Sequence, residues 1–420
     1  MANAQVPVPA GGVTHDVRAR KGTSLARLTP LLFALGPGVI GLCADNDAGG
    51  MLSYVVTGAS HGLAWLLPAL VFLGLPTVFV MWVALRVAEA THMPYSRVLL
   101  ASVGRTLTRV EAFVLYVLNG IILVTEFAGM SLALSLAGLP RSLSALVTFG
   151  LVLALTSFGA YPRIERLLLR VAIGNLAFLP ALFLVHRSGG AMAAAFTAHV
   201  PNASFLLLAL AGNTLAPWMI YWQQNAVWAG EVRTAGQRAM DLIIGQITMI
   251  IMASTVLLLG ALMPGSASAW ASPVAWIFHD GGAMPGILFA MGLFDAGLLS
   301  ACTISLASLW TLREAVGQGA KRHTEAPNRG KWQVLHIGTL ALAASAVTWP
   351  NLAFGSLALW TQALGAIWMP VSLILLGSVA TNRRVMGRLA LGLPAKVALG
   401  ALAAGDLVLA CLGIAGGGVG

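Results

Sequence analysis

The chain has 420 residues, of which 58% are hydrophobic and only 9% are charged, and its mean hydropathy is +0.86. This composition excludes a soluble globular domain and indicates a protein with many membrane crossings. The formal net charge of +10 does not point to nucleic acid, because the basic residues recur in short segments between apolar runs rather than on one module.

The chain begins with a polar segment, residues 1–28, which carries Arg18, Arg20, Lys21 and Arg27. A cleavable signal peptide would place an apolar run much nearer the start. We therefore predict a disordered cytoplasmic tail here.

Eleven apolar runs follow, each long enough to cross a bilayer as a helix. Their length and their richness in Leu, Ala and Gly exclude a transmembrane barrel, whose strands would be shorter and alternating. The sequence predicts an all-α membrane protein with eleven transmembrane helices. The expected spans are 31–59, 63–87, 112–137, 143–160, 167–186, 203–228, 240–263, 285–312, 332–349, 353–380 and 395–418.

The loop charges give the orientation of these spans. If the N-terminus is cytoplasmic, every Lys and Arg of the chain except Arg141 and Arg187 falls on the cytoplasmic side. Such a distribution is typical of inner-membrane proteins. We predict a bacterial inner-membrane protein with its N-terminus inside and its C-terminus outside.

Two of the predicted spans are interrupted by polar and helix-breaking residues at corresponding positions, five spans apart. Broken helices in this relation are typical of inverted-repeat transporters, with the binding site at the breaks. We predict a first repeat over 29–190, a second over 200–382, and an additional helix within 393–420. The interrupted segments are Ala44-Asp45-Asn46-Asp47-Ala48-Gly49-Gly50 and Asn213-Thr214-Leu215-Ala216-Pro217-Trp218.

The first break carries the chemistry of a cation site. Asp45 and Asp47 supply carboxylates and Asn46 supplies an amide oxygen, which suit hard divalent cations. Gly49 and Gly50 are expected to let the backbone leave helical geometry, so that carbonyls can coordinate a cation. We predict Asp47 as the main ligand and Asp45 as an accessory ligand; alternatively, either aspartate caps the following half-helix.

The second break offers further oxygens. Pro217 removes a backbone donor, and Asn213 and Thr214 can supply oxygen ligands. Trp218 and Gln223 follow and are candidates for an access vestibule; the alternative is that the aromatic residue packs between helices.

Three more polar side chains lie inside predicted spans. Glu126 and Asp295 are candidate acids of a proton or access path, although Asp295 would alternatively lie near the outer mouth. Gln362 would donate an amide oxygen to the site or bond across helices. We expect Asp406, in the last span, to be peripheral.

These residues resemble the NRAMP family of divalent metal transporters over most of the chain after residue 30. The resemblance implies the LeuT-type fold, with a 5+5 inverted repeat. The matching segments are Gly36-Pro37-Gly38, Thr57-Gly58-Ala59, His61-Gly62, Gly292 to Val316, Gln362 through Pro370 to Asn382, and Met386-Gly387.

Two motifs depart from the family pattern. Asp47-Ala48-Gly49-Gly50 stands where the family has Asp-Pro-Gly-Asn, and Ala216-Pro217-Trp218-Met219 stands where it has Met-Pro-His-Asn. The resemblance implies that Asp47 and the carbonyls of Ala44 and Asn213 bind the metal. Gly50 then replaces an asparagine ligand, and Ala216 replaces the thioether ligand. The family's acidic pair in the third span is reduced to Glu126, with Gly129 at the second position.

This pattern resembles the NRAMP-related magnesium transporter branch, which Trp222-Gln223 also matches. Loss of the thioether removes the preference for softer metals. The resemblance therefore implies a secondary transporter for Mg²⁺ or Mn²⁺ in partly hydrated form, working by alternating access and driven by membrane potential. The missing histidine and reduced acidic pair argue against proton coupling. The expected partners are the cation and the lipid bilayer, with no cofactor and a monomeric chain.

A second interpretation keeps the fold and changes the cargo to a small, amino-acid-like acid, held by half-helix N-termini. The two aspartates argue against an anionic substrate unless a cation accompanies it. A membrane enzyme has little support, because the sequence shows no nucleophile–base pair or phosphate-binding glycine loop.

Overall fold

The computed structural model describes residues 35–60, 62–157, 161–185, 193, 195–196, 203–230, 232–262, 277, 281–317, 330–350 and 352–416. Within these ranges all regular secondary structure is helical, and no strand occurs. The tail predicted at 1–28 lies outside them, as do the ends of several predicted spans.

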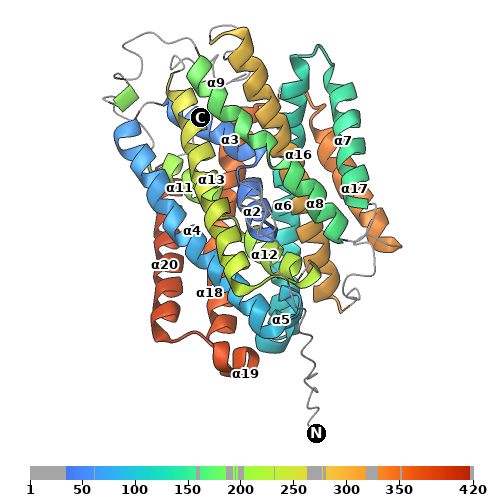
Figure 1. Cartoon of the computed structure of the whole chain (residues 1–420), viewed down its shortest axis with the longest axis vertical. Helices are drawn as coiled ribbons and strands as arrows, with labels where there is room; N and C mark the ends of the chain where they lie inside the picture. The colour runs from blue at the N-terminus through green and yellow to red at the C-terminus, as the bar shows by residue number, and fades with distance from the viewer. Residues whose placement is uncertain are drawn as a thin grey trace, which may run out of the picture.

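The long helices form one bundle, with the broken helices at its centre (Figure 1). Part of every predicted span is helical. The elements in chain order are α2 (Pro37–Asp45), α3 (Ala48–Ala59), α4 (Leu63–Thr91), α5 (Tyr95–Ser102), α6 (Arg105–Ser135), α7 (Arg141–Ser157), α8 (Tyr161–Val171), η1 (Gly174–Ala177), α9 (Phe178–Leu184), α11 (Ala203–Thr214), α12 (Pro217–Ala229), α13 (Ala235–Ala261), α16 (Ala283–Ala315), α17 (Lys331–Ala346), α18 (Phe354–Ala380), α19 (Arg383–Met386), η2 (Gly387–Leu389) and α20 (Leu393–Ala415).

Eight helical stretches of the described chain are long and apolar enough to cross a membrane. The first predicted span is not among them because it is split into α2 and α3. The fourth and ninth spans contain α7, with 17 residues, and α17, with 16 residues. At 1.5 Å per residue these two helices extend about 25 Å, slightly less than the hydrocarbon core. The count of eleven crossings therefore stays a prediction.

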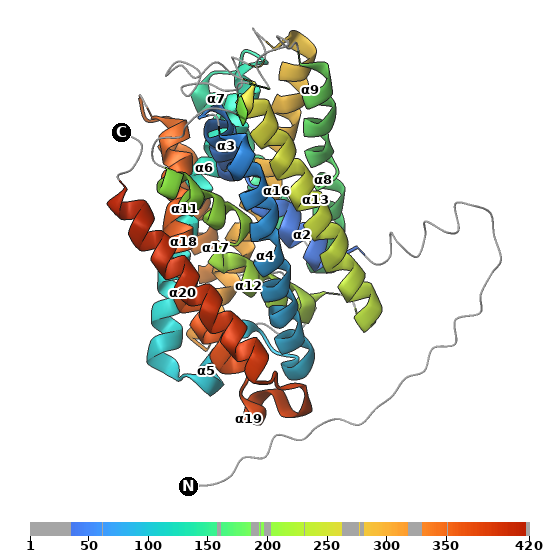
Figure 2. The ribbon, with the colours of Figure 1, turned by 90° about the vertical axis from the view of Figure 1, so that its left-hand side faces the viewer.

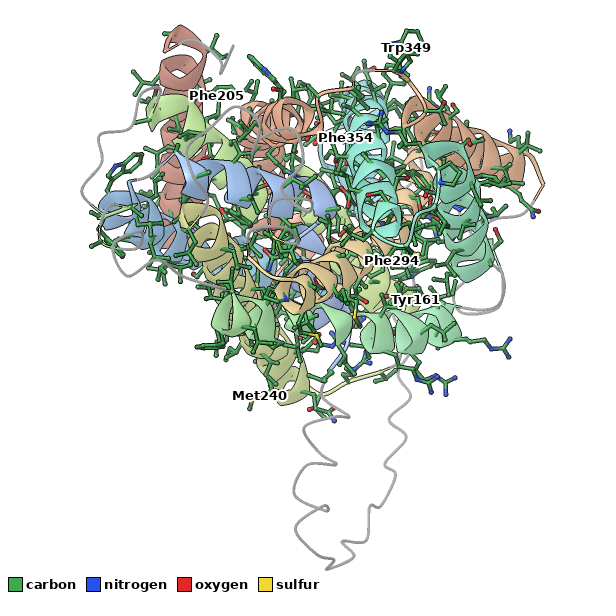
Figure 3. All side chains as sticks on the ribbon, turned by 90° about the horizontal axis from the view of Figure 1, so that it is seen from above. Tyr161, Phe205, Met240, Phe294, Trp349 and Phe354 are labelled. Atoms are coloured by element: carbon green, nitrogen blue, oxygen red, sulfur yellow. The ribbon has the colours of Figure 1, made fainter. Side chains whose placement is uncertain are left out.

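The bundle buries polar side chains and exposes apolar ones, as expected of a protein surrounded by lipid. Large apolar side chains are exposed: Val334 and Leu342 are 72% and 73% exposed, and Trp349, labelled at the edge of the bundle in Figure 3, is 71% exposed. Asp47 and Glu126 are only 2% and 0% exposed. Burying carboxylates while leaving tryptophan and leucine exposed is unfavourable in water and favourable in a bilayer.

The broken pair α2–α3 is enclosed by α6, α13, α16 and α18, all of which contact it. The second broken pair, α11–α12, packs against α4 and α18. The last helix, α20, crosses the outside of the bundle beside α11 and α18 (Figure 2). This arrangement places the two breaks near the centre of the bundle, enclosed by other helices.

Candidate metal site at the two helix breaks

The first break is a two-residue interruption between α2 and α3, formed by Asn46 and Asp47. Asp47 is the N-cap of α3, because its Oδ1 accepts a hydrogen bond from the backbone N–H of Gly50. Glu126 of α6 also caps the start of α3, because its Oε2 accepts a hydrogen bond from the backbone N–H of Ala48 at 2.9 Å. Two carboxylates therefore lie at the positive end of the α3 dipole.

Gly49 and Gly50 do not leave helical geometry, so this expectation from the sequence was wrong: both belong to the first turn of α3. A Cβ on Gly49 would lie 2.6 Å from Thr125 Oγ1. A Cβ on Gly50 would lie 2.9 Å from Asp47 Oδ1 and 3.0 Å from Asn213 Oδ1. Close packing, not backbone freedom, therefore requires glycine here, and two side-chain oxygens border the space beside Gly50.

The second break consists of Leu215 and Ala216, between the end of α11 at Thr214 and the start of α12 at Pro217. The backbone N–H of Ala216 donates to Met219 Sδ at 3.4 Å. The thioether of Met219, in the first turn of α12, therefore lies beside the second break. The sequence analysis missed this sulfur because it considered a thioether only at position 216. The signal was available, because Ala216 and Met219 are three residues apart and residues at that spacing lie on one face of a helix.

Backbone carbonyls at the broken ends accept hydrogen bonds from hydroxyl groups of other helices or half-helices. Each hydroxyl uses one lone pair of its carbonyl, which leaves the second available to a cation. The Ala44 and Asn213 carbonyls, both predicted ligands, belong to this set. The pairs are Ser300 Oγ to Ala44 O at 2.6 Å, the Tyr54 hydroxyl to Asn213 O at 3.1 Å, and Thr77 Oγ1 to Thr214 O at 2.6 Å.

Asn213 and Gln362 connect the breaks to each other and to α18. Asn213 Nδ2 donates to the carbonyl of Gly50 at 3.3 Å and also to Ser53 Oγ. Gln362 Nε2 donates to Asp47 Oδ1 at 3.0 Å. The structure therefore brings together Asp47, Asn213 and Gln362, which lie in the first, sixth and tenth predicted spans.

Three side-chain oxygens at the breaks are buried and have no hydrogen-bond partner: Asp45 Oδ2, Asn46 Oδ1 and Asn213 Oδ1. Asn46 is held in place by its amide, which donates to the carbonyl of Met249 in α13 at 2.8 Å. Buried oxygens without a donor are costly, and a cation would satisfy them. In the described part of the chain no three His, Cys, Asp or Glu side chains form a metal-binding group. A cation here would therefore be held by mixed carboxylate, amide and carbonyl oxygens.

Four predicted residues stay outside this hydrogen-bonded group. The Thr214 hydroxyl donates to a carbonyl of its own helix at 3.1 Å. Trp218 and Gln223 are buried on α12, and their side chains form none of the hydrogen bonds described at the breaks. Asp295 lies farther along α16, beside η1. The side chains of Trp218, Gln223 and Asp295 thus belong to α12 and α16, away from the hydrogen bonds around Asp47, and Thr214 contributes only its carbonyl to the breaks.

Asp241 of α13 was missed by the sequence reasoning, although it lies just inside a predicted span. Its two carboxylate oxygens accept hydrogen bonds from the backbone N–H groups of Gly36 and Gly38, each at 2.7 Å, and of Val39 at 3.0 Å. These are N–H groups that a helix start leaves without intrahelical partners. Asp241 therefore fixes the beginning of α2, the half-helix that leads to Asp45.

Arg233 strengthens the same anchor. Its guanidinium forms an ion pair with Glu165 of α8 at 2.6 Å and donates to the carbonyl of Leu35 at 3.2 Å. The start of α2 is thus attached to α8 and α13 through charged groups. The sequence does not reveal this anchoring role of Arg233, because Leu35, Glu165 and Arg233 lie far apart in the chain.

Residues 38–416 match the Nramp family, described as natural resistance-associated macrophage protein-like. The chain belongs to the Nramp family. Together with the apolar helices, membership makes this Nramp chain an integral membrane protein. No curated protein matches the sequence.

The fold of this Nramp chain is similar to solved structures of the manganese transporter of Eremococcus coleocola. A single-residue mutant and a complex with an aromatic bis-isothiourea substituted compound each give a TM-score of 0.69 at 18% identity. Each match covers 94% of this chain and 88% of the transporter. At this identity the likeness shows the fold.

Proposed function

We propose that this Nramp chain is a secondary transporter that moves Mg²⁺ or Mn²⁺, in partly hydrated form, across the membrane by alternating access. The observation that carries the proposal is the convergence of Asp47 and Asn213 on the space beside Gly50. Manganese transport by the structurally similar protein from Eremococcus coleocola supports a divalent cargo.

The donor set favours hard cations. Asp47 is proposed as the charged ligand and the free Oδ1 of Asn213 as a second, with the carbonyls of Ala44 and Asn213 completing the site. Asp45 contributes negative charge from the end of α2. Mg²⁺ and Mn²⁺ are bound by such oxygens and retain several waters. Glu126, which is hydrogen-bonded to the start of α3, is proposed to serve the access path. Asp295 and the α12 residues Trp218 and Gln223 are proposed to serve the same path at a greater distance from Asp47.

The architecture proposed for this mechanism is the LeuT-type repeat over 29–190 and 200–382, with the helix within 393–420 as an addition. Both broken pairs are consistent with it, because α3 and α12 each begin at the centre of the bundle with an N-cap at the break. Half-helices that end at a shared site can tilt independently of their other halves.

The test is cation uptake into proteoliposomes of purified protein, with the potential set by potassium and valinomycin. We expect wild-type vesicles to take up Mg²⁺ or Mn²⁺ and Asp47→Ala vesicles to take up neither. Glu89→Gln is the matched control, because it removes a carboxylate near the end of α4 whose partners are Arg86 and Arg238. Uptake by Asp47→Ala at the wild-type rate would show that the cation does not use this site.

Calorimetry on the same proteins separates the two cargo classes. Saturable binding of Mg²⁺ or Mn²⁺ that disappears in Asp47→Ala supports the cation proposal. If no divalent ion binds while a small amino acid raises the melting temperature, the organic-solute interpretation takes its place.

A further inference from the structure

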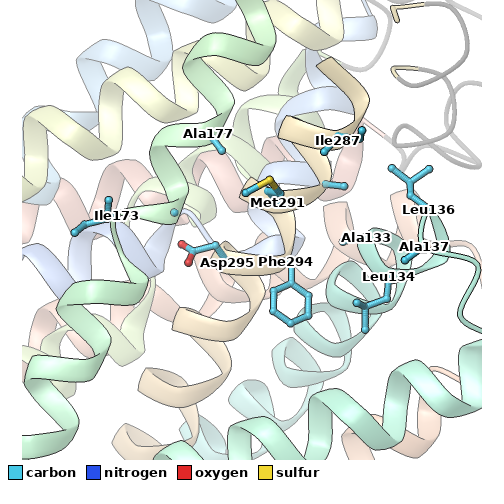
Figure 4. Close-up of a pocket in the computed structure, with 12 residues that line it drawn as sticks. Ala133, Leu134, Leu136, Ala137, Ile173, Ala177, Ile287, Met291, Phe294 and Asp295 are labelled. Atoms are coloured by element: carbon cyan, nitrogen blue, oxygen red, sulfur yellow. The ribbon is translucent and has the colours of Figure 1, made fainter. Parts of the chain in front are cut away.

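A cavity of about 540 Å³ lies between the end of α6, the η1–α9 segment and the first half of α16 (Figure 4). Figure 4 shows Met291, Phe294 and Asp295 on α16, with Ile173 and Ala177 on one side and the Ala133–Ala137 segment on the other. Its volume falls in the range of small-molecule sites, about 300–1,000 Å³. The cavity is separate from the helix breaks.

The rim of the cavity faces lipid. Ile173, Met291 and Ile287 are 64%, 58% and 45% exposed, although all three are apolar. In a bilayer such exposed side chains are in contact with hydrocarbon. A ligand would therefore enter this cavity from the membrane, and most of its own surface must be apolar.

One carboxyl group, that of Asp295, interrupts the apolar lining. Asp295 reaches the backbone of η1, where the N–H of Asn175 donates to its carboxylate and a Cβ on Gly174 would collide with it. Its Oδ2 has no hydrogen-bond partner, and none of the ion pairs in the described part of the chain includes it. A carboxylate in this environment is unfavourable unless a positive charge accompanies it.

A metal ion would not supply that charge favourably, because Mg²⁺ and Ca²⁺ require about six oxygen ligands and this cavity offers a single carboxylate. An ammonium group needs only one such partner. We propose that the cavity binds an amphipathic organic monocation, with its ammonium group against Asp295 and its apolar body against α6 and α16. This inference does not depend on the transported ion.

The test is binding of tritiated imipramine, a tertiary amine with a tricyclic body, to the full chain in lipid nanodiscs. Empty nanodiscs give the partition into lipid, and the saturable remainder measures binding to the protein. Asp295→Asn keeps the shape of the side chain and removes its charge; we expect a loss of affinity of about tenfold or more. Iminodibenzyl, the neutral tricycle, should compete weakly.

Two further variants keep the proposal testable if Asp295→Asn folds poorly. Ala137→Phe fills the cavity from the exposed turn that follows α6 and should also abolish saturable binding. Asp406→Asn removes a carboxylate that lines a different cavity and should leave binding unchanged. Absence of saturable binding, undiminished binding in Asp295→Asn, or an equal loss in Asp406→Asn would overturn the proposal. Divalent uptake is measured separately, so failure here leaves the transport proposal standing.

Discussion

Replacing Gly50 by alanine tests whether the space beside α3 is where the cation binds. Gly50 lies in the first turn of α3 and has no positive φ, so alanine is compatible with the backbone. In an ordinary helix this change would be stabilising by about 1 kcal/mol. Any loss of cation binding must therefore come from the added methyl group.

The size of the effect follows from the distances. The new Cβ would lie 2.9 Å from Asp47 Oδ1 and 3.0 Å from Asn213 Oδ1, both closer than ordinary van der Waals contact. Without a cation the two side chains can shift only by weakening their hydrogen bonds to Gly50, Ser53 and Gln362; with a cation both oxygens must also face it. Overpacking by one methyl group costs about 1–3 kcal/mol, which corresponds to a Kd raised about 5- to 150-fold.

Isothermal titration calorimetry with Mg²⁺ and Mn²⁺ measures this change, and thermal unfolding confirms that the variant is folded. Gly120→Ala is the matched control: Gly120 is also within a membrane-spanning helix, but a Cβ there would meet nothing within 4 Å. A Kd of Gly50→Ala within about twofold of the wild-type value would refute the site geometry.

Three further results are expected. Met219→Leu removes the sulfur that accepts from the Ala216 N–H but none of the proposed oxygen ligands, so we expect Mg²⁺ and Mn²⁺ binding to change little; a loss as large as that of Asp47→Ala would place the sulfur in the site. Asp241→Ala removes the acceptor for three N–H groups at the start of α2, and we expect this to cost about 2–4 kcal/mol. It should also speed alkylation of the buried Cys43, measured in a Cys302→Ser, Cys411→Ser background. An unchanged alkylation rate would contradict the anchoring role. Glu126→Gln keeps an acceptor for the start of α3 and loses one charge, so melting temperature should stay nearly constant while divalent affinity falls; a large drop in melting temperature would instead indicate a structural role.

Hydropathy predicted the helices well because each crossing needs a long apolar run, and the breaks were visible because Asp45, Asp47 and Pro217 are so unusual within such runs. The positions of the two interruptions, at residues 46–47 and 215–216, fall inside the segments proposed from sequence. These features depend on residues that are neighbours in the chain, which a sequence pattern can capture.

Contacts between distant residues were beyond that reasoning. The sequence permits glycine at 49 and 50 either for backbone freedom or for close approach, and only the position of Thr125 and Asn213 decides between them. Asp241 looked like a residue at the edge of a span, yet its partners are 202 to 205 residues away. The role of Met219 likewise depended on a side-chain rotamer that composition does not specify.

The first broken helix also constrains how the protein is made. Asp45 and Asp47 each oppose entry into hydrocarbon by about 3 kcal/mol. The side-chain donor that reaches Asp47 from another helix, Gln362, is made much later during synthesis, with α18. The nascent first segment must therefore be sheltered at the translocon until most of the chain has emerged. Biogenesis, and not only the proposed transport, would then depend on the same two carboxylates.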